Sequence, residues 1–133
     1  MSEENVEIAH RCFGAFNKGG LSAAERFFDS EIIFDLSRSP FPDAGLYHGF
    51  EGVREWFGGL ADAFGPVRYE MEKVRDLGEK VAVMLRVRGR GPGSGIDVDY
   101  RFVPVFTFRD GKIVRMDRFA DWDEALEAAG LSE

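Results

Sequence analysis

The sequence predicts one α+β domain, in which helices cover one face of an antiparallel sheet. Most of the first 64 residues repeat apolar side chains every three or four positions, as amphipathic helices do. From residue 67 the apolar period changes to two, which is typical of half-buried strands, and no helix separates these strands. The 133 residues, 44% of them hydrophobic, contain no repeat or linker, so we expect residues 1–133 to form a single domain.

The first elements are two helices and a strand. The first helix is expected over residues 3–16, and Lys18-Gly19-Gly20 should stop it because glycine favours helix ends. Ser22-Ala23-Ala24-Glu25 has the pattern of a capping box and predicts a short second helix through Phe28. Residues 32–36 then predict a strand. The apolar stripe of the first helix consists of Val6, Ala9, Cys12, Phe13 and Phe16.

A long loop and a third helix follow. Residues 37–49 contain two prolines and two glycines and form a loop long enough to act as a lid or rim. A third helix is expected over residues 51–64, and Gly65-Pro66 ends it. The apolar positions of this helix are Val53, Trp56, Phe57, Leu60 and Phe64.

The second half of the chain predicts a run of antiparallel strands and a short terminal helix. Gly89 to Gly95 is a glycine-rich turn that lacks the lysine and the following helix of a phosphate-binding loop. Asp121-Trp122-Asp123-Glu124 repeats the capping pattern and starts a C-terminal helix that Gly130 closes. The four strands are expected over residues 67–76, 80–88, 96–108 and 112–120.

The last hairpin allows two registers, and they place opposite sets of side chains on the helix-facing side of the sheet. A three-residue loop, Arg109-Asp110-Gly111, pairs Phe108 with Lys112. It therefore pairs Phe106 with Val114, Pro104 with Met116 and Phe102 with Arg118. A two-residue loop, Asp110-Gly111, instead pairs Phe106 with Arg115 and Pro104 with Asp117.

We expect the three-residue loop, because it separates apolar from charged side chains and a one-residue slip would mix them. Arg118 then points to the apolar side, beside Phe102 and Tyr100. A buried guanidinium is costly without a partner. Arg118 therefore either reaches solvent at the strand end, pairs with an internal acid, or serves as a polar anchor at the mouth of a cavity.

The composition of the chain argues against several classes of function. The net charge of −7 argues against nucleic acid as a partner, since phosphates require a basic surface. No apolar run approaches the length of a membrane span, and neither a signal peptide nor an internal disulfide is indicated, because Cys12 is the only cysteine. No two histidines stand at metal-ligand spacing. We expect a soluble cytoplasmic domain without membrane, metal or other cofactor.

Four segments, taken in order, resemble the landmarks of SnoaL-like domains, a family of the nuclear transport factor two-like superfamily that includes ketosteroid isomerase, limonene epoxide hydrolase and polyketide cyclases. These segments are Phe16–Leu21, Tyr47–Arg54, Thr107–Val114 and Glu124–Leu131. The resemblance implies a cone-shaped fold, with a curved sheet around the long first helix and an apolar cavity open at one end. It also implies a homodimer.

The catalytic groups of these relatives are missing at the matching positions. Where ketosteroid isomerase has a tyrosine and two aspartates, this chain has Cys12, Leu36 and Pro104. The aspartate of polyketide cyclases matches Arg118, which has the opposite charge. The sequence contains the residue types of the Asp–Arg–Asp arrangement of limonene epoxide hydrolase. The expected register, however, places Asp99 and Asp117 on the outer face. The residues in question are Asp99, Arg101, Asp117 and Arg118.

Three hypotheses therefore remain. The first is a domain that binds a small apolar molecule in the cone. The second is a lyase, isomerase or hydrolase that uses Tyr47, His48 and Arg118 at the rim, although a histidine in a loop is commonly just solvated. The third is a non-catalytic dimerisation or interaction module whose cone is filled by phenylalanines. The predicted lining of the cavity is Cys12, Leu36, Tyr47, Trp56, Tyr100, Phe102, Phe106, Met116 and Arg118.

Overall fold

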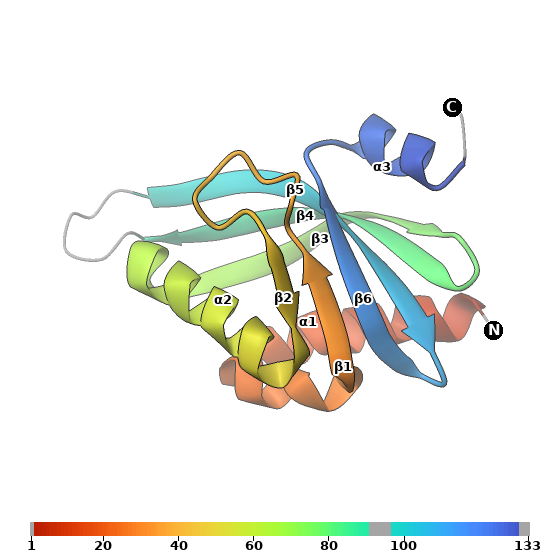
Figure 1. Ribbon diagram of the computed structural model, residues 1–133, viewed down its shortest axis with the longest axis horizontal. Coiled ribbons are helices and arrows are strands. Elements are labelled where there is room, and N and C mark those ends of the chain that lie inside the picture. The colour runs from red at the N-terminus through yellow and green to blue at the C-terminus, as the bar shows by residue number, and fades with distance from the viewer. Residues whose placement is uncertain (1, 91–96, 131–133) are drawn as a thin grey trace.

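The computed structural model describes residues 2–90 and 97–130, and it has the predicted α+β class (Figure 1). The glycine-rich turn predicted at residues 89–95 lies largely outside these residues. The elements, in chain order, are α1 (Ser2–Ala24), the 3-10 helix η1 (Glu25–Phe27), β1 (Phe28–Asp35), β2 (Leu46–His48), α2 (Gly49–Phe64), β3 (Val67–Asp76), β4 (Lys80–Arg90), β5 (Asp97–Arg109), β6 (Lys112–Phe119) and α3 (Trp122–Ala128).

The six strands form one curved, unclosed sheet in the order β2-β1-β6-β5-β4-β3. Every neighbouring pair is antiparallel except β1 and β6, which are parallel. The sheet is therefore mixed rather than purely antiparallel. A parallel pair needs a long connection, and here the whole chain from β2 and α2 through β5 separates the two strands.

The ends of the helices follow the local sequence signals. The helix α1 is kinked at Gly20, whose φ of 74° and ψ of −165° are not helical, so the predicted stop becomes a kink. The predicted short second helix is the turn after this kink together with η1. At the start of α3, the Asp121 carboxylate accepts a hydrogen bond from the Glu124 amide at 2.9 Å, as the capping pattern predicts.

Part of the predicted loop at residues 37–49 is a strand. Residues Leu46–His48 form β2, which pairs with Ile33–Asp35 at the edge of the sheet. The strand is only three residues long and carries little periodicity, which is why the pattern of the sequence did not reveal it.

The prediction of a three-residue hairpin loop between β5 and β6 is wrong. The turn consists of Asp110 and Gly111, whose φ values of 53° and 77° are both positive, as a two-residue primed turn requires. Arg109 consequently faces Lys112. A β-bulge next to Phe108 then shifts the register once more.

The two shifts together move the pairing by two residues, so the side chains keep their expected faces. Phe106 faces Met116 rather than Val114, and Pro104 faces Arg118 rather than Met116. Because the side-chain period of a strand is two, Met116 and Arg118 still point to the helix side. Near the turn, where the bulge lies, Ile113 takes the buried position expected of Val114.

Helices lie on both faces of the sheet, not on one as expected. The helix α1 packs against β3 and β4, and α2 packs against β1 and β2, around a core rich in aromatic rings. The short helix α3 lies across the opposite face, as Figure 1 shows. There Ala125 packs on a smaller apolar cluster with Val103, Val105 and Phe119.

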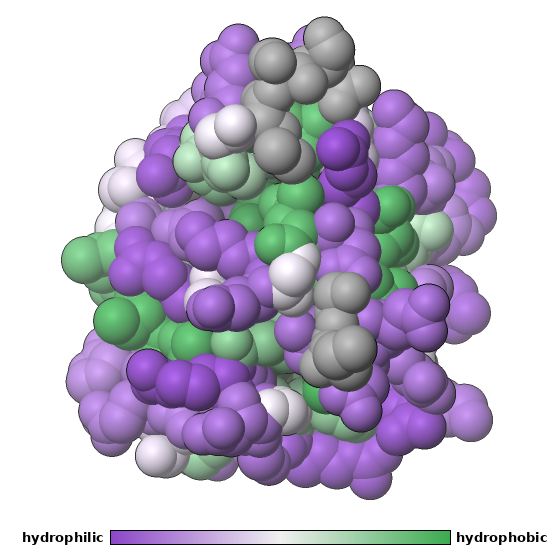
Figure 2. All heavy atoms as spheres, turned by 90° about the vertical axis from the view of Figure 1, so that its right-hand side faces the viewer, coloured by the Kyte–Doolittle hydropathy of each residue, from purple (hydrophilic) through white to green (hydrophobic). Residues whose placement is uncertain are grey.

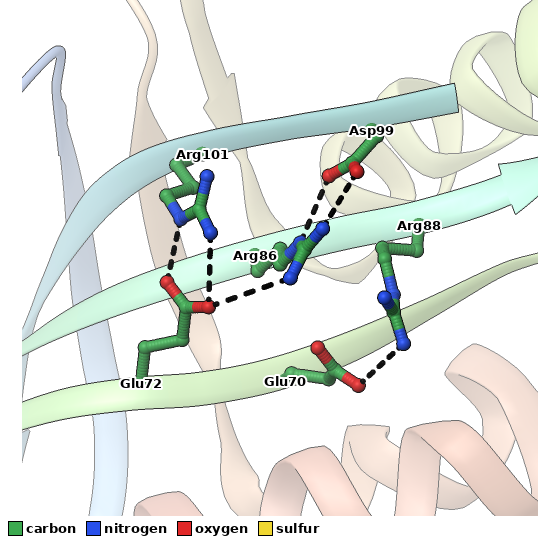
Figure 3. Close-up of polar contacts among 6 residues, drawn as sticks. All are labelled: Glu70, Glu72, Arg86, Arg88, Asp99 and Arg101. Atoms are coloured by element: carbon green, nitrogen blue, oxygen red, sulfur yellow. Dashed lines mark hydrogen bonds and ion pairs between the residues drawn. The ribbon is translucent and has the colours of Figure 1, made fainter. Parts of the chain in front are cut away.

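The outer face of β3, β4 and β5 carries a network of alternating charges (Figure 3). Arg86 donates to Asp99 at 2.7 and 2.9 Å and lies 3.9 Å from Glu72, which also accepts from Arg101 at 2.6 Å. Hydrogen bonds from these guanidinium groups lower the pKa of Glu72 and of Asp99. The network keeps this part of the outer face polar.

We predict that acidification weakens the fold through this network. Because the pKa of Asp99 is lower in the folded chain than in the unfolded one, the stabilisation is present above about pH 4 and is lost as the pH falls through the folded pKa. Asp99→Asn should therefore show a smaller decrease in the free energy of unfolding between pH 6 and pH 3. Urea unfolding at both pH values measures it.

The control for this prediction is Asp123→Asn, which removes an exposed carboxylate on α3. This variant should keep the dependence of the wild-type chain on pH. An Asp99→Asn variant whose loss of stability on acidification equals that of the wild type would refute the role of the network.

Candidate functional site

A large apolar cleft lies between α2, the loop before β2, the start of β5 and the end of β6. Its volume is about 1050 Å³, and part of the α2 wall is formed by Gly58 and Gly59, which have no side chains. The cleft lies at the end of the molecule where α2 ends, on the left in Figure 1. Its aromatic and large apolar lining consists of Phe41, Tyr47, Trp56, Leu60, Phe64, Tyr100 and Phe102.

The interior behind this cleft has little free space. A pocket of only about 40 Å³ lies between α1 and the sheet. Phe13 and Phe16 of α1 contact the ring of Tyr69 with centroids 5.8 and 4.8 Å apart, and Phe13 also contacts Phe106 at 5.7 Å. A ring-sized ligand therefore finds space at the mouth of the fold rather than in its centre.

The opposite end of the molecule, which carries the start of α1 and the turns after β3 and β5, offers a different environment. Figure 2 shows a mostly hydrophilic surface there. A hollow of about 870 Å³ at this end is lined largely by polar and charged side chains, such as Glu7, Arg11 and Arg109. It does not suit an apolar ligand.

Asp43 fixes the loop that forms one wall of the cleft. Its carboxylate accepts hydrogen bonds from the Ser39 hydroxyl at 2.5 Å and from the Trp56 indole N–H at 3.0 Å. Its backbone carbonyl accepts one from the Tyr47 hydroxyl at 2.8 Å. Sequence reasoning missed Asp43, because an aspartate in a loop carries no signal of the distant side chains that it holds.

Arg118 is the buried cation of the cleft. The residue is 8% exposed, and its guanidinium lies over the ring of Phe102, 4.8 Å from the ring centroid. Two other arginines of the cleft wall are paired, Arg54 with Glu25 at 2.7 Å and Arg101 with Glu72 at 2.6 Å. Within residues 2–90 and 97–130, no carboxylate lies within 4.0 Å of the Arg118 guanidinium.

Two tyrosine hydroxyls face the same space. Burial and the nearby charge of Asp43 raise the pKa of Tyr47. Burial also raises the pKa of Tyr100, although the positive charge of Arg118 opposes that shift. Both phenols are therefore protonated at neutral pH. The Tyr47 hydroxyl already donates its proton to the Asp43 carbonyl, whereas the Tyr100 hydroxyl can donate one hydrogen bond to a ligand.

The structure divides the predicted lining between two places. Tyr47, Trp56, Tyr100, Phe102 and Arg118 line the cleft. The small inner pocket is lined by Cys12, Phe106 and Met116, and also by Trp56 and Phe102. Leu36 is completely buried and lines neither.

Cys12 lies in apolar surroundings that suppress its reactivity. Burial raises the pKa of its thiol to about 12. The thiol therefore stays protonated at neutral pH, and protonated thiols are poor nucleophiles.

His48 is separated from the other two residues suggested for catalysis. Its imidazole Nε2 lies 3.1 Å from the Glu31 carboxylate on the surface, and its side chain does not line the cleft. Tyr47 and Arg118, in contrast, line the same cleft. Any acid–base chemistry in the cleft would have to use these two, Tyr100 or a carboxylate of the wall.

An Asp–Arg–Asp arrangement does form on the outer face, but Asp117 is its only member among the residues considered for it from the sequence. Arg115 donates to Asp35 at 2.8 Å and to Asp117 at 3.0 Å. The Ser37 hydroxyl, which donates to Asp35, is the largest cause of the lowered pKa of that carboxyl. The parallel pairing of β1 with β6 creates this cluster, so a prediction limited to the last hairpin could not find it.

The described part of the chain offers no group of three His, Cys, Asp or Glu side chains that could hold a metal ion. None of its helices is both long and apolar enough to cross a membrane.

Residues 9–116 match the model of the SnoaL-like domain family. The chain belongs to this family. Among curated proteins, no sequence matches it. The match covers α1 from residue 9 onward and all of the sheet up to the middle of β6, and therefore most of the residues that build the cleft.

Solved structures of the same fold share little sequence with this SnoaL-like chain. TerC, co-crystallised with polyporic acid, is 18% identical, with a TM-score of 0.76 over 96% of this chain and 99% of TerC. A protein of Jannaschia sp. CCS1 described as a SnoaL-like polyketide cyclase is 22% identical, with a TM-score of 0.74 over 99% and 95%. A ketosteroid isomerase-like protein of Catenulispora acidiphila in complex with trimethylamine is 16% identical, with a TM-score of 0.70 over 94% and 93%.

We predict that Asp43→Ala loosens the loop wall of the cleft. The substitution leaves the buried Trp56 N–H without an acceptor, so the free energy of unfolding should fall by about 1–3 kcal/mol. Trp56 fluorescence should also shift to longer wavelength. Asp62→Ala, which removes an exposed carboxylate from the opposite wall, is the matched control and should change stability by less than about 0.5 kcal/mol. Equal effects of the two substitutions would contradict an anchoring role for Asp43.

Proposed function

We propose that this SnoaL-like domain binds a small, largely apolar molecule with a ring system in the cleft between α2 and the ends of β5 and β6. The observation that carries the proposal is the combination of a cleft of about 1050 Å³ lined by aromatic rings with an interior that has little free space. Pockets for small ligands are typically apolar and contain a few polar groups that orient the ligand. Here those groups are Tyr47, Tyr100 and Arg118.

Two neighbours in fold were crystallised with small organic molecules. TerC was crystallised with polyporic acid, and the Catenulispora acidiphila protein with trimethylamine. Identities of 18% and 16% do not transfer either ligand to this chain. They support the more general proposal that the fold accommodates small organic molecules.

Catalysis in the same cleft is a second candidate function, and the buried guanidinium of Arg118 favours it. A cation and a protonated phenol such as Tyr100 on one wall could stabilise an oxyanion formed from a carbonyl or an epoxide oxygen. An isomerase, cyclase or hydrolase reaction would use this pair. Assays with keto-steroids and epoxides test the idea, and any activity should be lost in Arg118→Met.

Sequence and family resemblance support a proposal for assembly and location. We propose a cytoplasmic homodimer, a common assembly in the superfamily that this chain resembles. Sedimentation equilibrium at micromolar concentration tests the dimer. A dimer that binds none of the probes described below would favour the third hypothesis, a non-catalytic interaction module.

We predict that Gly59→Phe blocks the cleft. A Cβ atom at Gly59 would meet nothing within 4 Å, so the phenyl ring can extend into the cleft without displacing other protein atoms. N-phenyl-1-naphthylamine, a neutral aromatic probe, should bind the wild-type chain saturably and bind Gly59→Phe at least tenfold more weakly. Fluorescence titration measures this, and urea unfolding should show no loss of stability, since glycine is a poor helix residue.

The matched control is Gly14→Phe on α1, another exposed helical glycine at which an added Cβ atom would meet nothing within 4 Å. It does not line the cleft and should bind the probe like the wild type. Failure of the wild-type chain to bind the probe saturably, or equal binding by Gly59→Phe, would overturn the proposed site.

A further inference from the structure

We propose that the ligand of this cleft carries a planar oxyanion, such as an aromatic carboxylate, and that Arg118 binds it. This inference rests on the proposed function, since it specifies the chemical class of the molecule that the cleft takes. It starts from the one guanidinium in the cleft wall that is buried and lacks a carboxylate partner among the described residues.

The position of Arg118 is set by the sheet and not by its own flexibility. It lies near the end of β6, where it pairs with Pro104 and follows the buried Met116 on the helix side. The bulge near the turn determines which residues of this part of β6 face the helices, so the Arg118 side chain cannot reach the outer face of the sheet. The whole residue is only 8% exposed, and a charge in such surroundings is costly to keep without a counter-charge.

The donors of Arg118 point into the cleft. Arg118 lines the cleft, and in the described residues the one fully buried side-chain polar atom without a partner is the Thr107 hydroxyl oxygen. The guanidinium nitrogens are therefore not sealed inside the protein. They remain available to a ligand atom that enters the space.

The acids of the cleft wall do not neutralise this charge. Both carboxylate oxygens of Asp43 already accept hydrogen bonds, from Ser39 and from Trp56. Glu55 and Asp62 belong to the α2 wall, and neither comes within 4.0 Å of Arg118. A ligand anion is therefore attracted to Arg118 on β6 and repelled by Asp43, Glu55 and Asp62.

The surroundings of Arg118 select a flat ligand. Phe102 lies under the guanidinium, and the ring of Tyr100 stacks beside Phe102 at 6.2 Å with an interplanar angle of 25°. This aromatic surface offers a platform for a ring system, and the planar fork of Arg118 matches the geometry of a carboxylate. The Tyr100 hydroxyl stands on the same wall as a further donor.

A pair of probes of nearly equal shape tests the inference. The probes are 2-naphthoate, which is anionic at pH 7, and 2-acetonaphthone, which is neutral. Isothermal titration of the wild-type chain should show at least tenfold tighter binding of 2-naphthoate. Arg118→Met should weaken 2-naphthoate at least tenfold and change 2-acetonaphthone by less than threefold. Arg118→Lys, which keeps the charge but loses the planar fork, should fall between the wild type and Arg118→Met.

Arg68→Met is the control for net charge, because Arg68 is exposed on β3 and does not line the cleft. It should bind both probes like the wild type. Retained binding of 2-acetonaphthone by Arg118→Met shows that this variant is folded, and its circular dichroism spectrum provides an independent check.

The outcomes separate this inference from the proposed function. If the wild-type chain binds neither probe, the proposed function fails and the inference fails with it. If the chain binds both probes equally, or if Arg118→Met keeps the preference for 2-naphthoate, the cleft is a ligand site but Arg118 does not select an anion.

Discussion

The packing of α1 against the inner face of the sheet is the constraint on which the rest of the molecule depends. Phe13 and Phe16 fill the space beside Tyr69 and Phe106, leaving only a pocket of about 40 Å³ there. Because protein interiors pack to nearly crystalline density, a chain with this many inward rings cannot also keep a deep empty cone. Space for a ligand is thereby moved to the mouth, where α2 and the loop held by Asp43 form the walls.

The alternation of side chains between the two faces of β6 decides which charged residues face that space. Arg115 and Arg118 are three residues apart on β6 and therefore lie on opposite faces of the sheet. On the outer face Arg115 finds Asp35 and Asp117, and its charge is compensated within the fold. On the inner face the neighbours are aromatic, and Arg118 has Phe102 instead of an acid. One strand thus supplies a structural ion pair on one side and an unpaired cation on the other.

Local patterns predicted the elements well and their long-range pairing poorly. The period of two predicted the bounds of β3, because they depend only on neighbouring residues. The inward direction of Arg118 was predicted from the hairpin register and held only because the turn and the bulge together shift the pairing by two residues. The hairpin register depended on Asp110 accepting a positive φ and on a bulge, neither of which the alternation of apolar residues encodes. The bonds from Ser39 and Trp56 to Asp43, like the pairing of Arg115 with Asp35, join segments that only the finished fold brings together.

Because the chain as a whole is negatively charged, the buried Arg118 must act on an anionic ligand at short range. A chain with a net charge of −7 does not attract anions from a distance, so long-range steering does not favour an anionic ligand. Discrimination must then come from contact distance, where the low dielectric of a buried site strengthens a single ion pair and salt screens it less. In the proposed site, the preference for an anion therefore rests on the single side chain of Arg118, while the aromatic packing behind it supplies the apolar surface.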